Sequence, residues 1–242
     1  MSDFPNGVDP ARSASARSAP DGPARGGTTA DESAPLGPLT GESASIRSAK
    51  AKLRAELLLR RRALPPAARA AAAARVRAAL LDLVTRLTPR CVAAYVPIGS
   101  EPGGPELPDA LAEAIGPDGR LLLPVLRPDL DLDWARHVAG APLRAGDRGL
   151  REPAGTRLGV TAITEASVVV VPALAVDRRG VRLGRGGGSY DRALARVRPE
   201  AFTVALLHDG EVRDRVPAEP HDRRVRAVIT PEGLLQLPAP TL

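Results

Sequence analysis

The chain is poor in aromatic residues and in cysteine. Its 242 residues include two Phe, two Tyr and one Trp. Because proteins that bind unpaired bases stack them on aromatic rings, this scarcity argues against a single-stranded nucleic-acid platform. The one cysteine, Cys91, has no partner for an internal disulfide and lies in the apolar run CVAAYV. We therefore expect a buried thiol and a reducing compartment.

Long hydrophobic runs are also missing. No uninterrupted apolar stretch reaches the roughly 18 residues that a membrane-spanning helix needs. The first ten residues, MSDFPNGVDP, do not place a basic segment ahead of an apolar one, as a secretory signal does. These absences predict a cytoplasmic protein without a membrane partner, and we expect a monomer.

Large apolar side chains are scarce in residues 1–44, which are mostly Ser, Ala, Gly, Pro and Asp. Such a composition cannot bury enough surface to offset the entropy lost on ordering. We predict a disordered tail over residues 1–44 and a single domain over residues 45–242. Residues 1–45 carry a net charge of −3, so the remainder carries +9 to give the overall +6. A basic body favours an anionic partner.

Hydrophobic spacing predicts two helices at the start of the domain. From Ile46, leucines at 53, 57 and 64 share one helical face, and Pro65-Pro66 ends the run. A second helix is expected over 67–87. Short apolar runs then follow, of the kind that form strands buried on both faces: residues 91–96, 121–126, 167–174, 202–207 and 225–230.

Helical segments near 105–115 and 190–197 separate some of these runs. The alternation predicts an α/β fold, a three-layer α/β/α arrangement with a mostly parallel sheet. Ligands of such sheets bind in loops beyond the carboxyl ends of the strands. The segments after residues 96, 172 and 207 are therefore the expected site.

A glycine-rich loop lies in VRLGRGGGSYDRAL, residues 181–194. It lacks the Gly-Lys-Ser/Thr ending of a P-loop and the third glycine of a dinucleotide fingerprint. Successive exposed amides can nevertheless form an anion-binding nest, and a helix starting near Ser189 would add its positive end. Arg182 and Arg185 would supply guanidinium groups. The alternative interpretation is a plain turn.

Only two of the 34 basic side chains are lysines, Lys50 and Lys52, and both lie in one turn of the first helix. Lysine is a compact point charge suited to a phosphate, and Arg54 lies one turn after Lys50. The alternative is a solvated basic face. We expect the triplet RRR at residues 60–62 to be such a face.

Three carboxylates are candidates for a site. Asp191 follows the glycine loop and Asp222 lies in PAEPHDRRV, so both could hold Mg²⁺ together with phosphates, or serve as helix caps and turn residues. Glu101 follows the first strand, but this position in a loop does little to distinguish it from an ordinary surface charge. The three histidines show no ligand spacing, and no nucleophile–base arrangement stands out.

Four segments together resemble the 5-formyltetrahydrofolate cyclo-ligase family, also called methenyltetrahydrofolate synthetase. They are AKAKLR, YVPIGSEP, VVVVPALAVDRRGVRLGRGGGSYDRAL and PAEPHDRRVRAVITPEG, and the similarity runs from about residue 46 to 233. The resemblance implies a three-layer α/β/α fold, with Mg²⁺ and ATP required to close 5-formyltetrahydrofolate to 5,10-methenyltetrahydrofolate. It implies small-molecule substrates and no nucleic acid.

The resemblance also assigns roles. Lys50 and Arg185 would be catalytic, and Asp191 and Asp222 would be associated with the metal. Substrate contacts would come from Val96, Glu101, Arg185, Gly186, Gly187, Gly188 and Ser189. ATP contacts would come from Lys50, Arg54, Arg182, Leu183, Gly184, Arg185, Gly186, Gly187, Gly188, Ser189 and Tyr190.

Four positions depart from the family's pattern: Ser189 stands where Tyr is common, Gly104 where Thr is common, and Ala173 and Val176 where Gly and Phe often occur. Two other functions stay open. A basic nucleic-acid module would use residues 60–62 with Arg223, Arg224 and Arg226 and would bind in a salt-dependent way. A sugar-phosphate isomerase or CoA-transferase relative would not consume ATP.

Overall fold

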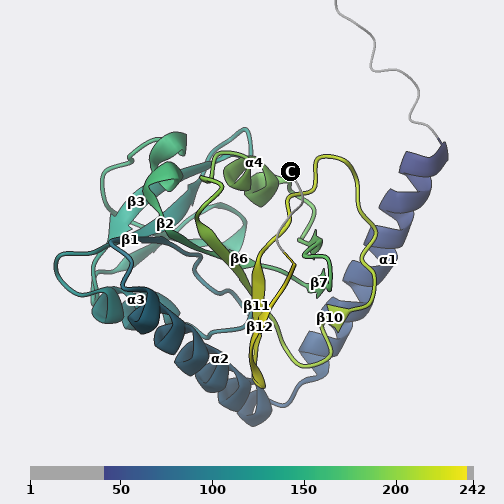
Figure 1. Cartoon of the computed structure of the whole chain (residues 1–242), viewed down its shortest axis with the longest axis horizontal. Coiled ribbons are helices and arrows are strands. Elements are labelled where there is room, and N and C mark those ends of the chain that lie inside the picture. Colours follow the sequence, from purple (N-terminus) through teal and green to yellow (C-terminus); the bar gives the residue numbers. More distant parts are fainter. Residues whose placement is uncertain (1–40, 239–242) are drawn as a thin grey trace, which may run out of the picture. The chain divides into compact units, whose positions relative to one another are not determined.

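The computed structural model describes residues 41–238, so the predicted tail lies almost wholly outside the described residues. A seven-stranded sheet forms the centre (Figure 1), with strand order β12-β11-β9-β6-β1-β2-β3. Its strands are β1 (Cys91–Ala93), β2 (Arg120–Leu126), β3 (Leu132–His137), β6 (Val168–Pro172), β9 (Phe202–Leu206), β11 (Ala227–Thr230) and β12 (Gly233–Gln236).

The five inner strands are parallel, and the two edge strands, β3 and β12, are antiparallel to their neighbours. Valine and leucine dominate the inner strands because both faces of the sheet are covered. The predicted mostly parallel sheet is confirmed. The antiparallel edges were not predicted: β3, with the sequence LDWARH, contains three charged or polar residues in six, yet all but Arg136 are buried.

Helices cover both faces of the sheet, as the three-layer prediction requires. On one face lie α2 (Pro66–Leu87) and α3 (Leu107–Ile115), whose Val76, Leu80 and Leu111 pack into one hydrophobic cluster with the strands. The other face is covered by α4 (Ser189–Leu194) and the 3₁₀ helix η2 (Val160–Glu165). Cys91 is buried there with a free thiol, as expected.

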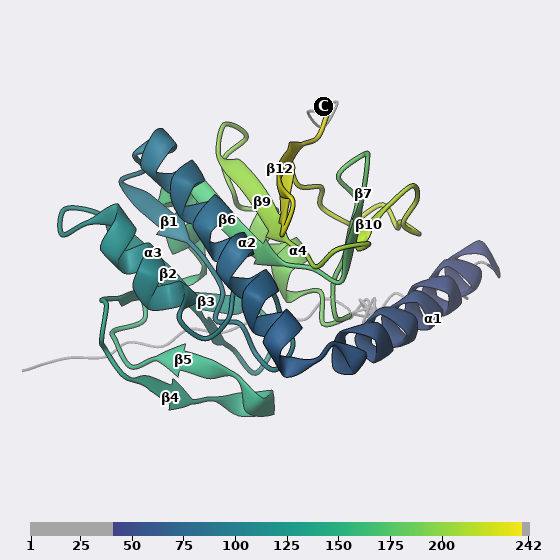
Figure 2. The ribbon, with the colours of Figure 1, turned by 90° about the horizontal axis from the view of Figure 1, so that it is seen from below.

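Helix α1 (Gly41–Ala63) lies apart from these layers and beside the β7–β10 region (Figure 2). It packs through Leu57 on a small second sheet of β7 (Ala175–Asp177), β8 (Arg182–Leu183) and β10 (Val212–Arg213). The helix starts five residues before the predicted position and ends at the predicted prolines. None of the helices among residues 41–238 is long and apolar enough to cross a bilayer.

A hairpin of β4 (Leu143–Ala145) and β5 (Arg151–Pro153) is the remaining pair of strands, and it brackets a short 3₁₀ turn, η1 (Asp147–Gly149). The hairpin is linked to the main sheet by a hydrogen bond that the amide of Leu126 in β2 donates to the carboxylate of Glu152, at 2.8 Å. The hairpin thereby faces the carboxyl ends of the parallel strands.

Candidate functional site

A cavity of about 620 Å³ opens at the carboxyl edge of the parallel strands. Its wall is formed by α1, the ends of β1, β2 and β6, the β4–β5 hairpin, the glycine loop and the segment around residue 220. All fifteen residues that the sequence assigned to a site line this one cavity. Two of the three expected loops, those after residues 96 and 172, contribute to the wall directly.

The cavity wall carries a surplus of positive charge. Eight of its residues are Lys or Arg and five are Asp or Glu. A concave site with three net positive charges attracts anions and raises their local concentration. The arrangement therefore suits a ligand that bears phosphates or carboxylates.

The glycine loop takes a path that only glycine follows easily. Gly186 has a φ of 104° and Gly188 a φ of 68°, both in the left-handed region, whereas Gly187 has an ordinary φ. Helix α4 begins at Ser189, as predicted. Within the described chain, none of the amides of residues 185–188 donates to another backbone group. These amides are available to an anion, as a nest requires.

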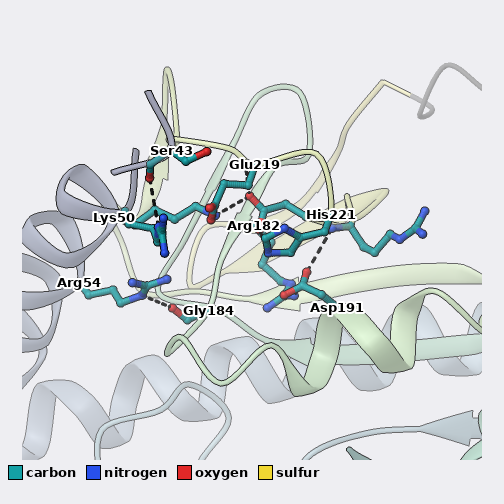
Figure 3. A network of polar contacts seen from close by, with 11 residues as sticks. Ser43, Lys50, Arg54, Arg182, Gly184, Asp191, Glu219 and His221 are labelled. Carbon is teal, nitrogen blue, oxygen red and sulfur yellow. Dashed lines mark hydrogen bonds and ion pairs between the residues drawn. The ribbon is translucent and has the colours of Figure 1, made fainter. Parts of the chain in front are cut away.

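Two arginines support this loop rather than stand free in the cavity (Figure 3). Arg54 Nε donates to the carbonyl oxygen of Gly184 at 2.9 Å, and Arg182 Nη2 donates to Asp191 Oδ1 at 2.7 Å. A Cβ added at Gly184 would lie 2.8 Å from Arg182 Nη1. Arg182 is buried, and its Nε has no hydrogen-bond partner among the described residues.

Lys50 is buried, with 4% of its surface exposed, and Lys52 is exposed. The Lys50 ammonium donates to Glu219 Oε2 at 2.8 Å and to Asp222 Oδ2 at 2.6 Å (Figure 3). The hydrogen bond from Lys50 lowers the pKa of the Glu219 carboxyl below its usual range. Lys50 thus belongs to the cavity, and the interpretation of it as a solvated residue is wrong.

The residues around position 220 fit a divalent cation. Ligand atoms of Glu219, His221 and Asp222 lie within 4.8 Å of one another, and the Lys50 ammonium already bridges the two carboxylates. Carboxylate oxygens are the donors that Mg²⁺ prefers. Asp191 lines the same cavity, but its Oδ1 accepts hydrogen bonds from Arg182 and from the amide of Arg223.

The sequence did not single out Glu219 or His221 as ligands. Glu219 precedes a proline and stands three residues before Asp222, and the Glu219 amide donates to Asp222 Oδ2 at 2.6 Å. This tight turn brings the two carboxylates together on the ammonium of Lys50. The spacing Glu-Pro-His-Asp was visible in the sequence, but only the turn shows that these side chains converge.

Glu101 is buried, with 8% of its surface exposed. Its carboxylate accepts hydrogen bonds from the amide of Ile98 at 3.0 Å, and Arg185 Nε lies 2.9 Å from it. Burial raises the pKa of the Glu101 carboxyl, and the guanidinium of Arg185 opposes that rise. Glu101 is therefore a shielded carboxylate in the loop after β1, in the same cavity wall as Val96, and the surface-charge interpretation is wrong.

The triplet at residues 60–62 requires a correction. Arg60 and Arg62 are exposed as predicted, but Arg61 is 1% exposed and lines the cavity. Lys50, Arg54, Leu57 and Arg61 are spaced along one stripe of α1, so the buried face of this helix carries three cations as well as leucines. The prediction failed because the partner of Arg61, Glu211, is 150 residues away in sequence.

Two of the four departures from the family's pattern lie in the cavity wall, Ser189 and Ala173. Gly104 lies near Ala73 and Arg77 of α2, and Val176 of β7 is buried in a hydrophobic cluster. Ser189 adjoins Tyr190, whose hydroxyl is buried without a hydrogen-bond partner among residues 41–238. That orphaned hydroxyl is a polar group available to a ligand.

These features define an α/β protein with a positively charged cavity at the carboxyl edge of its sheet, an arrangement shared by many enzymes that act on phosphorylated compounds. A sequence profile described as the 5-formyltetrahydrofolate cyclo-ligase family matches residues 46–231. The chain is 45% identical over 194 residues to the 5-formyltetrahydrofolate cyclo-ligase of Mycolicibacterium smegmatis, covering 78% of this chain and 97% of that protein. The chain belongs to this enzyme family.

Solved structures agree with the assignment. The 5,10-methenyltetrahydrofolate synthetase of Aquifex aeolicus is 28% identical, with a TM-score of 0.67 over 80% of this chain and 95% of that one. The synthetase of Mycoplasma pneumoniae is 18% identical, with a TM-score of 0.60 over 75% of this chain and 98% of that one, and shows the same fold. Both proteins are named for the same folate chemistry.

Proposed function

We propose that the protein converts 5-formyltetrahydrofolate to 5,10-methenyltetrahydrofolate, with Mg²⁺ and ATP consumed and ADP and phosphate released. One observation carries the proposal. A single basic cavity gathers the glycine loop and Lys50 at one part of its wall and Glu101 with Val96 at another. Two substrates that react directly with each other need such a shared cavity.

The phosphate end of the cavity is proposed to be the glycine loop. Its free amides and the Lys50 ammonium offer donors to phosphate oxygens, and Arg54 fixes the loop by holding the carbonyl of Gly184. Backbone amides are strong donors to anions when they are arranged in advance, because they need not reorganise during the reaction. Arg182 and Asp191 would hold the start of α4 in place.

The folate end is proposed to be the wall that contains Glu101. Its carboxylate is an acceptor in a cavity wall that also includes the apolar side chains of Val96, Ala173 and Leu174. An amino-pterin ring presents N–H donors on a flat apolar ring, so a buried carboxylate beside small apolar side chains suits it. The pairing of Arg185 with Glu101 joins the two ends of the cavity.

The chemistry needs no protein nucleophile. The formyl oxygen of the folate attacks the γ-phosphorus of ATP, and the bond from that phosphorus to ADP breaks. N10 of the folate then attacks the activated formyl carbon and loses its proton, and the C–O bond breaks to release phosphate. Positioning and charge neutralisation dominate phosphoryl transfer, which matches a site built from amides and cations.

A divalent cation would be held at Glu219 and Asp222. Such an ion supplies charge neutralisation to the phosphates of ATP. For it to bind there, the Lys50 ammonium must leave at least one carboxylate, which frees that ammonium for a phosphate oxygen. Asp191 would act alongside by holding Arg182.

The test measures ADP release and methenyl product, by its absorbance, with purified full-length protein. We expect both only when 5-formyltetrahydrofolate, ATP and Mg²⁺ are present together, in a one-to-one ratio. Product without ATP consumption would favour the isomerase or transferase alternative. Salt-sensitive binding of nucleic acid with no turnover would favour the nucleic-acid module.

A further inference from the structure

Arg61 is a buried residue of the cavity wall, and it connects three loops that leave the sheet at the same edge. Its Nε and Nη2 donate to the two carboxylate oxygens of Glu211, both at 2.7 Å, and Nη2 also donates to the carbonyl of Ala173 at 2.6 Å. Glu211 Oε2 in turn accepts from the amide of His208 at 2.8 Å, and the His208 ring bonds to the carbonyl of Ser100 at 2.9 Å.

These partners come from three different strand exits. Ser100 follows β1 and directly precedes Glu101, Ala173 follows β6, and residues 208–211 follow β9. The third expected loop therefore contributes to the site without lining it. One guanidinium on α1 sets the relative positions of the loops that form the wall proposed for folate.

Stability alone gives little reason for this pair. Replacing a buried ion pair by apolar residues of similar size is often neutral or stabilising, because the attraction barely offsets the lost hydration of both charges. An apolar pair, however, could not donate to the Ala173 carbonyl or accept from the His208 amide. The pair's specific contribution is the geometry of those two loops.

We propose that Arg61 is a positioning residue that, through Glu211 and Ala173, holds the folate wall of the cavity in its binding geometry. The proposal rests on the function proposed above. It assigns Arg61 to the folate side, whereas the glycine loop is held separately by Arg54 and Arg182. Loss of Arg61 should accordingly weaken folate binding and leave ATP binding nearly unchanged.

The decisive variant is the double substitution Arg61→Met with Glu211→Gln, which removes both charges and keeps an acceptor for His208. We expect its melting temperature to stay close to the parent value, its KM for 5-formyltetrahydrofolate to rise about tenfold or more, and its KM for ATP to change less than about twofold. Calorimetric titration with 5-formyltetrahydrofolate alone should show the same loss of affinity.

Arg61→Lys tests whether the planar guanidinium is needed. Lysine keeps the positive charge, but its compact ammonium cannot hydrogen-bond to both Glu211 oxygens and to the Ala173 carbonyl together. It should raise the folate KM while the protein stays folded. Arg62→Met is the matched control, because Arg62 is exposed in the same triplet and has no partner in the described chain. It should behave as the parent in every assay.

Three outcomes would overturn the inference. Parent-like folate KM in either the double variant or Arg61→Lys would make the pair a structural element alone. Equal increases in both KM values would show that Arg61 does not act on the folate side. A parent protein that consumes no ATP with 5-formyltetrahydrofolate would refute the proposed function itself, and the inference would fall with it.

Discussion

Lys50 is a single residue whose ion pairs are already formed before any ligand binds. Its ammonium neutralises two carboxylates in the free protein, and in the proposed function the divalent cation takes over at least one of these carboxylates while the ammonium binds a phosphate oxygen. Lys50→Ala should lower kcat about a hundredfold, the cost of removing one prearranged donor to a developing charge. Lys52→Ala should have almost no effect, because Lys52 is exposed on the other side of α1. Steady-state kinetics of the two variants checks this, and equal losses would contradict it.

Glu101 should limit stability at neutral pH. Burial raises its pKa in the folded protein, so the folded state binds its proton more tightly than the unfolded state does. The protonated Glu101 carboxyl therefore stabilises the folded state below the pKa that it has in the unfolded state. This stabilisation is lost as the pH rises through its pKa in the folded state. Glu101→Gln should raise the melting temperature near pH 7.5 by about 2 °C or more and lose that gain near pH 4.

The same substitution should weaken folate binding, because an amide cannot replace a charged acceptor. The groups that face Glu101 are Arg185, Arg61, Tyr95, Tyr190 and the amide of Ile98. The two arginines and the amide favour its charged form, and the two tyrosines do not. Melting curves and folate titrations at both pH values measure the two effects. A Glu101→Gln variant with a lower melting temperature than the parent at pH 7.5 would refute the prediction that Glu101 lowers stability while it supports folate binding.

At the scale of elements, the glycine loop separates into positions with different demands. Gly188 has a left-handed φ and Gly187 does not, so Gly188→Ala should cost about 1–2 kcal/mol of backbone strain while Gly187→Ala should be tolerated. We expect Gly188→Ala to raise the KM for ATP about tenfold, because the amides of the loop would be displaced. Kinetics with both alanine variants, each shown to be folded by circular dichroism, tests the difference. Identical behaviour would mean that the loop relaxes freely.

Element prediction succeeded where local spacing decides structure. Helices α1, α2 and α3, and the five parallel strands, were expected near their observed positions, because prolines and runs of valine and leucine mark them in the sequence. Strands β3 and β12 were missed, as were the hairpin and the small sheet. These strands are short or mixed in polarity, and their pairing depends on neighbours distant in the chain.

At the scale of the whole molecule, the matched family region spans residues 46–231 and the cavity wall begins at Arg47. Deletion of residues 1–44 should therefore leave the melting temperature within about 2 °C of the parent and turnover within about twofold. Thermal unfolding and the cyclisation assay of the truncated chain measure both. Loss of cooperative unfolding would show that the domain begins earlier than predicted.

The layer architecture, the glycine loop, the start of α4 and the candidate residues could all be predicted from the sequence. These follow from periodicity, from residues with restricted or unusual backbone freedom, and from motifs that are contiguous in the chain. Which charges are buried, and which residues they pair with, became visible only in the folded chain. Arg61 meets Glu211, Lys50 meets Glu219 and Asp222, and Glu101 meets Arg185. The reason is that an ion pair depends on distance in space, and partners separated by more than 80 residues leave no local pattern.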